Sequence, residues 1–233
     1  MAKKGNISIF VPHNGCPQQC SFCNQKTITG KSEQPTPSDV ENAVKKALAK
    51  KGYKYEIAFF GGSFTAIDRD YMVSLLKAAS AFLDNERIYG IRISTRPDFI
   101  DNEVLDILKK YGVTSVELGA QSMDDEVLAA NLRGHTSAQV ESASKLIKSY
   151  GFELGLQMMT GLYKDTDEKA VSSAEKIIAL KPDTVRIYPT VVLKGTMLAD
   201  LYEQKIYKPQ TVDDAANLCT RLIPMFENAG IKI

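Results

Sequence analysis

The sequence alternates six times between a short apolar run and a longer amphipathic segment. The short runs are rich in β-branched and aromatic residues and are too brief for helices, so we interpret them as strands. They cover residues 6–12, 55–61, 90–95, 114–120, 152–159 and 184–189. Strands that alternate with helices pair in parallel through right-handed crossovers. The alternation therefore predicts one α/β domain without an evident linker, but periodicity alone does not separate an open doubly wound sheet from a barrel.

The segments between these runs carry helix signals at both ends. Their apolar residues recur three or four positions apart, and each stripe follows a residue or motif that can cap a helix N-terminus. The stripes span 40–48 after Pro-Ser-Asp, 72–83 after Asp68, 104–108 after Asp101, 140–147 after Thr136 and 170–178 after Asp165. A helix commonly ends at a glycine in the left-handed conformation. The glycines in that position are Gly52, Gly112, Gly151 and Gly230.

The last residues repeat a pattern seen twice earlier in the chain. In "KKYGVTSVEL" and "KSYGFELGLQ" a helix closes at glycine and a strand begins at once, and "ENAGIKI" starts the same pattern just before Ile233. A further strand is expected to begin there. We therefore expect residues 1–233 to form a single core domain that is cut short at its C-terminus, as a fragment or a shortened form of a longer protein.

Composition and charge exclude several classes of protein. Of the 233 residues, 44% are hydrophobic and 24% are charged, which is typical of a globular chain with one large core. The 29 basic and 28 acidic side chains nearly cancel, so no global field attracts nucleic acid or anionic lipid. No apolar run approaches the roughly 18 residues of a membrane span, and the N-terminus has no signal-peptide pattern. A cytoplasmic protein without membrane contact is expected.

Three of the four cysteines lie within eight residues, in the stretch "VPHNGCPQQCSFCNQ" at 11–25. Loops this short strain a disulfide and leave an odd thiol, so Cys16, Cys20 and Cys23 are better explained as metal ligands. Their loop follows the first strand, at the carboxyl edge where parallel sheets build sites. Zinc with His13 as the fourth ligand and a [4Fe–4S] cluster with one open iron both remain candidates. Structural zinc sites usually join separated segments, which modestly favours the cluster.

The stretch "GCPQQCSFCNQ" resembles the cluster loop of radical S-adenosylmethionine (radical SAM) enzymes, with the aromatic Phe22 just before the last cysteine. The chain is most similar to the branch of the elongator catalytic subunit, the methylthiotransferases and the oxygen-independent coproporphyrinogen oxidases. It departs from the elongator subunit, whose first two cysteines are spaced more widely, and it has no room for that protein's acetyltransferase domain. The resemblance implies a partial (βα)6 TIM-like barrel of parallel strands, a [4Fe–4S] cluster and S-adenosylmethionine.

Two motifs after the second and third strands extend this resemblance. "FFGGSFT" is similar to the family's glycine-rich turn, whose backbone receives the methionine amino group. A plain β-turn is the alternative explanation. The residues implied by this motif are Gly61, Gly62 and Ser63, where Ser63 replaces the common acidic residue. "ISTRPD" places Ser94 and Arg96 near the ribose and methionyl region, by analogy with the family.

Later strands add the remaining implied cofactor contacts. "ELGAQS" is similar to a stretch in which glutamine contacts the cofactor and an arginine twelve residues later binds the methionine carboxylate. These residues are Gln121 and Arg133; without the resemblance, Arg133 is most simply a surface arginine. Gln157 corresponds more loosely to a ribose ligand, and the adjacent methionines are equally well explained as core.

The implied function is that of a radical SAM enzyme. It would cleave S-adenosylmethionine reductively and form a 5′-deoxyadenosyl radical that acts on an unidentified substrate, with transfer RNA as the leading candidate. A donor such as flavodoxin or ferredoxin would supply the electron. The rival hypotheses are a zinc-binding interaction module and a non-catalytic iron–sulfur protein. The sequence assigns no further catalytic residue, no oligomeric state and no specific reaction.

Two other residues have competing interpretations. His135, in "RGHT", either lines the site or belongs to the entry of the following helix. Cys219 lies on the predicted apolar face of the last helix, which favours a buried structural thiol over a fourth ligand. The lysines of "KKALAKKGYKYE" are most simply a solvated helix face, and contact with RNA phosphates is the alternative.

Overall fold

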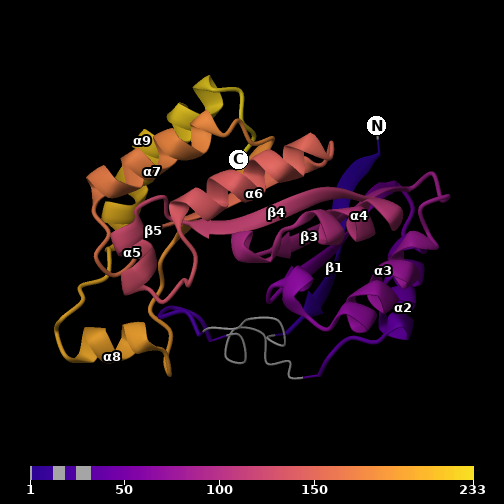
Figure 1. Cartoon of the computed structure of the whole chain (residues 1–233), viewed down its shortest axis with the longest axis horizontal. Helices are drawn as coiled ribbons and strands as arrows, with labels where there is room; N and C mark the ends of the chain where they lie inside the picture. The colour runs from indigo at the N-terminus through magenta and orange to yellow at the C-terminus, as the bar shows by residue number, and fades with distance from the viewer. Residues whose placement is uncertain (1, 13–18, 25–32) are drawn as a thin grey trace.

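The computed structural model describes residues 2–12, 19–24 and 33–233. Six parallel strands form one sheet in the order β1-β2-β3-β4-β5-β6 (Figure 1). The strands are β1 (Lys3–Val11), β2 (Tyr53–Gly61), β3 (Ile88–Thr95), β4 (Val113–Gln121), β5 (Glu153–Thr160) and β6 (Thr184–Pro189). Each predicted strand is present, with ends that differ from the predicted ones by three residues or fewer.

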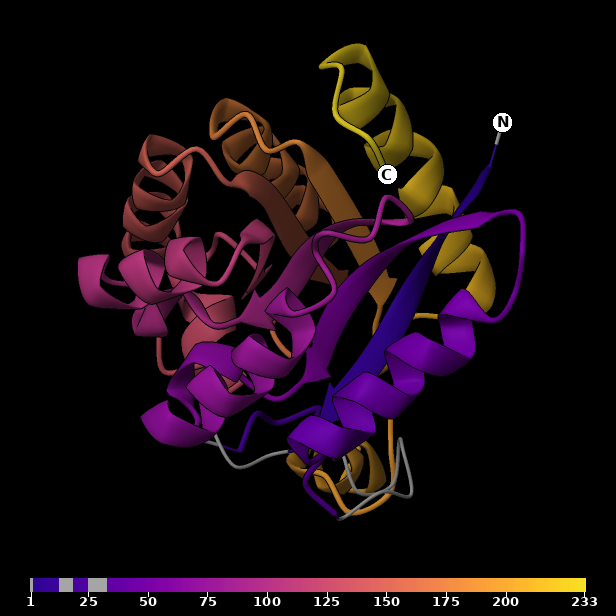
Figure 2. The ribbon, with the colours of Figure 1, turned by 90° about the vertical axis from the view of Figure 1, so that its right-hand side faces the viewer.

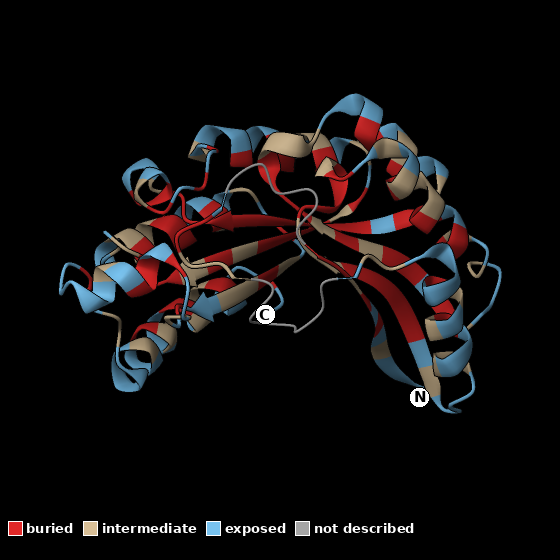
Figure 3. Cartoon of the chain, turned by 90° about the horizontal axis from the view of Figure 1, so that it is seen from below, coloured by how far each residue is buried: buried red, intermediate tan, exposed pale blue. Residues whose placement is uncertain are grey.

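The sheet curls into an arc with most of the helices on its outer side, while α8 (Met197–Glu203) lies beyond the carboxyl edge (Figures 1, 2 and 3). Neighbours in sequence are neighbours in the sheet, and β1 and β6 remain at its two edges. The arc is a partial TIM-like barrel, which confirms the predicted fold class. An unclosed barrel leaves the inner face accessible from one side.

The helices begin at side-chain caps, and Asp68, Asp101 and Thr136 are caps as the sequence predicts. The helix that begins at Pro37 is instead capped by Thr36, one residue before the predicted Pro-Ser-Asp signal. Thr36 and Thr136 both form capping boxes, with Asp39 and Gln139 respectively. The cap before α7 is Thr166, so the predicted start after Asp165 is one residue early. The helices are α2 (Pro37–Leu48), α3 (Arg69–Ser80), α4 (Asn102–Lys110), α5 (Asp125–Ala130), α6 (Ser137–Ser149), α7 (Asp167–Ala179), α8 (Met197–Glu203) and α9 (Val212–Asn228). Short 3₁₀ turns, η1 (Phe64–Ala66) and η2 (Pro97–Phe99), follow β2 and β3.

The core lies between the outer face of the sheet and the helices. Alternate residues of each strand, such as Ile57, Phe59 and Leu118, are fully buried there. The predicted helix stops are confirmed, because all four glycines are left-handed, with φ of 83° at Gly52, 73° at Gly112, 78° at Gly151 and 73° at Gly230. The periodic apolar pattern therefore accounts for the arrangement of sheet and helices.

The end of the chain packs against the edge strand β6. Lys232 forms a parallel β-bridge with Thr184, and Ile231 is buried. A strand-like pairing thus begins where the sequence predicts one, while the fragment hypothesis stays a prediction.

Cys219 is only half-buried, which corrects its assignment as a buried thiol; Leu218, Leu222 and Phe226 form the buried face of α9 instead. In the described ranges, no helix is long and apolar enough to cross a membrane.

Candidate functional site

A cavity of about 370 Å³ opens at the carboxyl ends of the strands. It is lined by Cys20 and Cys23 and by every residue that the sequence assigned to cofactor binding: Phe22, Gly61, Gly62, Ser63, Ser94, Arg96, Gln121, Arg133 and Gln157. Cys16 and His13 lie outside the described residues. The structure therefore brings the described candidates together around one space, while the ligand of each remains a prediction.

The cysteine loop lies against the segment that follows α5. Cys20 is buried, Cys23 is half-buried, and the Cys23 N–H donates to the Cys20 carbonyl at 3.1 Å. Arg133 Nη1 lies 3.0 Å from Cys20 Sγ, and its guanidinium stacks 5.9 Å from the centre of the Phe22 ring. The two cysteines and Arg133 thus face the same end of the cavity.

Close packing against β1 requires glycine at position 61, where β2 leads into the glycine turn. Gly61 has φ of 121°, and a Cβ there would lie 2.4 Å from the Val11 carbonyl oxygen. The Gly62 N–H donates to that same oxygen at 2.9 Å. A side chain at position 61 would therefore separate the turn from the end of β1. This fixes the glycine turn beside the strand that leads into the cysteine loop.

Ser63 and Arg96 hold the walls of the cavity together. The Ser63 hydroxyl lies 2.8 Å from Thr95 Oγ1 and accepts from the Arg96 N–H at 3.2 Å. Arg96 makes a two-point contact with Asp98 at 2.9 and 2.8 Å and donates to the Arg133 carbonyl at 2.5 Å. Apart from the Asp98 pair, these contacts join residues of the cavity lining to one another. They connect the turns after β2 and β3 to Arg133.

Gln121 and Arg133 meet on the β4 side of the cavity. Gln121 ends β4 with φ of 65°, and Arg133 Nη2 donates to the Gly119 carbonyl at 2.7 Å. Within the described parts of the chain, Gln121 Oε1, Arg133 Nε and Ser94 Oγ are buried without a hydrogen-bond partner. Buried polar atoms are rarely left unpaired in native proteins. These atoms leave one acceptor, one cationic donor and one hydroxyl for a polar ligand in the cavity.

The inner face of the sheet carries a charged floor beneath the cavity. Arg92 lies 2.7 Å from Glu56, 3.4 Å from Glu153 and 4.0 Å from Glu117. Glu117 in turn lies 3.1 Å from Arg186. Gln157 Nε2 donates to Glu117 at 2.6 Å. Glu117 is 1% exposed, so its carboxylate holds Gln157 and Arg186 from below.

Sequence reasoning missed five lining residues, Phe60, Thr95, Gly119, Arg186 and Tyr188. Four of them lie near the carboxyl ends of predicted strands, and that position was the available signal; Arg186 lies in the middle of the last predicted strand. Arg186 stacks 5.6 Å from the Phe60 ring, and its Nη1 lies 3.4 Å from the Tyr188 hydroxyl. Such contacts between β2 and β6 depend on the curl of the sheet, which the periodicity of each strand does not specify.

His135 is a buried structural residue rather than part of the cavity lining. Its Nε2 lies 3.2 Å from the Ala120 carbonyl oxygen. Burial, reinforced by the Arg133 charge, lowers the pKa of His135 to about 4. The side chain is therefore neutral at pH 7, and among the two earlier interpretations the structure supports the helix-entry one.

An incomplete parallel barrel with cysteines and convergent polar groups at its carboxyl edge defines an α/β enzyme-type site. The radical SAM superfamily model matches residues 10–177, and the model of the radical SAM C-terminal domain matches residues 182–233. The chain therefore belongs to the radical SAM superfamily, whose members are enzymes that use a [4Fe–4S] cluster and S-adenosylmethionine. The family confirms the predicted cofactors and favours the iron–sulfur cluster over zinc.

Curated relatives include elongator proteins and transfer RNA acetyltransferases. The chain is 30% identical over 200 residues to human Elongator complex protein 3, covering 77% of this chain and 37% of that protein. It is 29% identical over 194 residues to tRNA uridine(34) acetyltransferase of Methanocaldococcus jannaschii, covering 73% of this chain and 36% of the relative. The chain thus spans less than half the length of these two relatives.

Solved structures show the same fold. Elp3 of the archaeon Methanocaldococcus infernus matches 95% of this chain and 54% of its own, with a TM-score of 0.76 and 21% identity. Coproporphyrinogen III oxidase (HemN) from Escherichia coli matches 98% of this chain and 53% of its own, with a TM-score of 0.67 and 18% identity. At these identities the comparison establishes the fold.

The residues present fit the family's two cofactors. Two described cysteines stand at one end of the cavity, and the unpartnered Gln121 Oε1 and Arg133 Nε stand beside them. Thiolates are the usual ligands of iron–sulfur clusters, and a guanidinium suits a carboxylate. An amino acid-like ligand next to a thiolate-bound metal would therefore satisfy atoms that the protein alone leaves unpaired.

Proposed function

We propose that this chain is the radical SAM core of an enzyme that modifies transfer RNA. The observation that carries the proposal is that two cysteines and all nine predicted cofactor contacts line one cavity at the carboxyl edge of the arc. Family membership supports the chemistry, and the names of the curated relatives support the substrate class.

Each group of residues has a proposed role. Cys16, Cys20 and Cys23 would hold the [4Fe–4S] cluster through three irons. The turn at Gly61, Gly62 and Ser63 would receive the methionine amino group. Further contacts to S-adenosylmethionine would come from Phe22, Ser94, Arg96, Gln121, Arg133 and Gln157. When bound and reduced, the cluster would supply the electron for reductive cleavage of S-adenosylmethionine, which would provide a radical able to abstract hydrogen from the substrate.

The protein's own contribution is to orient the side chains that would contact S-adenosylmethionine. Arg96 fixes the backbone of Arg133 from one side, and Glu117 fixes Gln157 from below. Such contacts reduce the freedom of groups that must meet a ligand in one geometry. The barrel is not closed between β1 and β6, and an open side would admit a large substrate such as RNA. The electron donor, of the flavodoxin or ferredoxin type, and the cytoplasmic location stay predictions.

The test of the chemistry is anaerobic reconstitution with iron and sulfide. After reduction with dithionite in the presence of S-adenosylmethionine, 5′-deoxyadenosine is measured by chromatography. We expect about four irons per chain and product formation. Cys20→Ala and Cys23→Ala should lose both. Cys219→Ala is the matched control, because Cys219 lies on α9 outside the cavity lining. A loaded wild-type protein that neither binds nor cleaves S-adenosylmethionine would contradict the proposal.

The test of the substrate class is separate. Transfer RNA is added to the loaded protein, and its nucleosides are compared by mass spectrometry with a control that lacks S-adenosylmethionine. A cofactor-dependent mass change in one nucleoside supports the proposal. Cleavage that proceeds without RNA binding or RNA modification contradicts the transfer RNA assignment and leaves the radical SAM assignment intact.

A further inference from the structure

Ser21, between Cys20 and Phe22, is buried and fully hydrogen-bonded. Ser21 is 1% exposed, and all of its polar groups have partners. Its N–H and hydroxyl donate to the backbone carbonyl and to Oδ1 of Asn131, at 3.1 and 2.7 Å. Its carbonyl accepts from the Leu198 N–H of α8 at 2.8 Å. The peptide between the second and third cysteines is thus fixed from two sides by distant parts of the chain.

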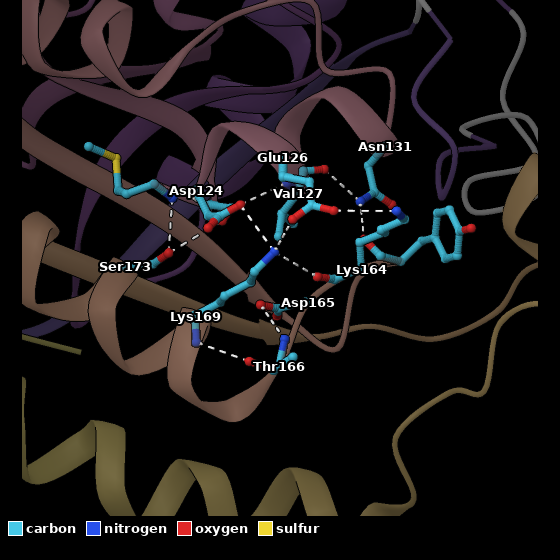
Figure 4. A network of polar contacts seen from close by, with 12 residues as sticks. Asp124, Glu126, Val127, Asn131, Lys164, Asp165, Thr166, Lys169 and Ser173 are labelled. Atoms are coloured by element: carbon cyan, nitrogen blue, oxygen red, sulfur yellow. Dashed lines mark hydrogen bonds and ion pairs between the residues drawn. The ribbon is translucent and has the colours of Figure 1, made fainter.

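Asn131 can make these bonds in only one orientation of its amide. Its Nδ2 donates to two carbonyl oxygens, of Val127 and of Tyr163, both at 2.8 Å (Figure 4). The side chain is fully buried. Exchanging Oδ1 and Nδ2 would place an acceptor against two acceptors, so Oδ1 must face Ser21. A carboxylate in this position would meet the same two carbonyls with a negative charge.

The turn after α5 places both Asn131 and the cavity-lining Arg133 against the cysteine loop. Asn131 caps the helix, Leu132 follows with φ of 54°, and the Leu132 and Arg133 N–H groups bond back to Ala129 and Leu128 at 3.1 and 3.0 Å. This is a Schellman ending, in which glycine is the usual residue at the left-handed position. As a result Asn131 reaches Ser21, while two residues later Arg133 reaches Cys20.

Helix α5 has only six residues, and ion pairs fasten it to the segment after β5. Glu126 lies 2.7 Å from Lys169 and 3.3 Å from Lys164 (Figure 4). Asn131 adds the Tyr163 contact to the same junction. The cysteine loop is therefore tied through Asn131 to the carboxyl ends of both β4 and β5.

We propose that Asn131 is a positioning residue for the cysteine loop: its amide fixes Ser21 and so holds Cys20 and Cys23 in the arrangement that receives the cluster. The proposal rests on the proposed function for the identity of the metal group. The contact itself is a property of the protein without the cluster, and it can be tested on that form.

The first measurement uses the cluster-free protein. Cys20 is 7% exposed, so a loop held in place protects its thiol from alkylation. The rate of iodoacetamide modification at Cys20 is followed by mass spectrometry, with Cys219 as the internal reference. Ser21→Ala and Asn131→Asp should each raise the Cys20 rate roughly tenfold relative to Cys219, the factor expected for one lost buried hydrogen bond. Ser144→Ala is the matched control, because Ser144 is equally buried at 1% exposed and lacks a partner among the described residues.

The second measurement uses the reconstituted protein. Iron and sulfide content and the electron paramagnetic resonance spectrum of the reduced cluster are compared for the same variants. We expect lower iron content or an altered spectrum in Ser21→Ala and Asn131→Asp, and wild-type values in Ser144→Ala. Wild-type alkylation rates and spectra in both loop variants would overturn the proposal. If Asn131→Asp fails to fold, Ser21→Ala, which removes a single oxygen, decides the result. If wild-type protein binds no cluster, the proposed function fails and the alkylation result still decides this inference.

Discussion

The two faces of the sheet carry different kinds of side chain. The outer face presents Ile57, Phe59 and Leu118 to the helices and is entirely apolar at these positions. The inner face presents Glu56, Arg92, Glu117 and Arg186, which contact one another across strands. Successive residues of the same strands point to opposite faces. The comparison indicates that the outer face provides apolar burial against the helices and that the inner face provides the polar site.

The largest effect is expected from breaking the charged floor. Arg92→Met removes the cation that lies 2.7 Å from the buried Glu56. A buried charge that loses its partner costs about 3–5 kcal/mol, and urea unfolding should show that loss in the free energy of unfolding. The double variant with Glu56→Gln should recover most of it. A loss below about 1 kcal/mol for the single variant would show that the inner face behaves as a solvated surface.

The outer face should respond in stability alone. Ile57→Ala removes a fully buried side chain and leaves a cavity against the helices. We expect a loss of about 3 kcal/mol in the free energy of unfolding with no change in the affinity of the folded protein for S-adenosylmethionine. Isothermal titration under native conditions measures the affinity. A tenfold weaker affinity would contradict the separation of the two faces.

The buried His135 and the half-buried Asp165 should give opposite pH dependences. The pKa of His135 is lowered to about 4, mainly by burial, so the folded state binds fewer protons than the unfolded state below pH 6.5. Its contribution to stability, of about 3 kcal/mol, is lost as the pH falls from 6.5 to 4. The pKa of Asp165 is raised to about 6, also mainly by burial, so its contribution to stability is lost as the pH rises through 6.

The wild-type pH profile should therefore be flatter than that of either variant. Urea unfolding between pH 4 and pH 7 should show a steeper loss toward acid in Asp165→Asn, because only the His135 term remains. His135→Gln should gain stability toward acid, because only the contribution of Asp165 remains. Identical slopes in all three proteins would mean that neither group is perturbed as the geometry indicates.

The smallest change in stability is expected in the turn after α5, which positions Arg133. Leu132 is left-handed with φ of 54° and 45% exposed, so its side chain contributes little burial. Leu132→Gly should stabilise the protein by up to about 1 kcal/mol, because glycine adopts this conformation without a steric penalty. The melting temperature measures the change. Destabilisation by the same amount would show that the Leu132 side chain supports the turn.

The same comparison explains what could be predicted from the sequence. The apolar outer face produces an alternation of apolar residues within each strand, and the helices that cover it carry apolar residues three or four positions apart. Strands and most helices were therefore predictable from local pattern. Helices α5 and α8 were not, because six and seven residues hold too few turns for a periodic signal. The gathering of Gln121 and Arg133 was predicted only through the family resemblance.

The inner face could not be predicted because its contacts depend on register and curl. Arg186 stacks on Phe60 although their strands lie four positions apart in the sheet order. Ser21 shows the same limit, since its partner Asn131 is 110 residues away. A single sequence gives the residues of such pairs, but only the folded arc places them together.

The most direct test of the central claim is the electron paramagnetic resonance spectrum of the reduced, reconstituted protein with and without S-adenosylmethionine. The account predicts a cluster signal that changes when S-adenosylmethionine is added. It also predicts that Gln121→Ala, which removes an unpartnered acceptor in the cavity, weakens the response to S-adenosylmethionine by roughly tenfold. Ser144→Ala, outside the cavity, should respond as the wild type does. A cluster signal in the wild type that S-adenosylmethionine leaves unchanged at every concentration would contradict the account.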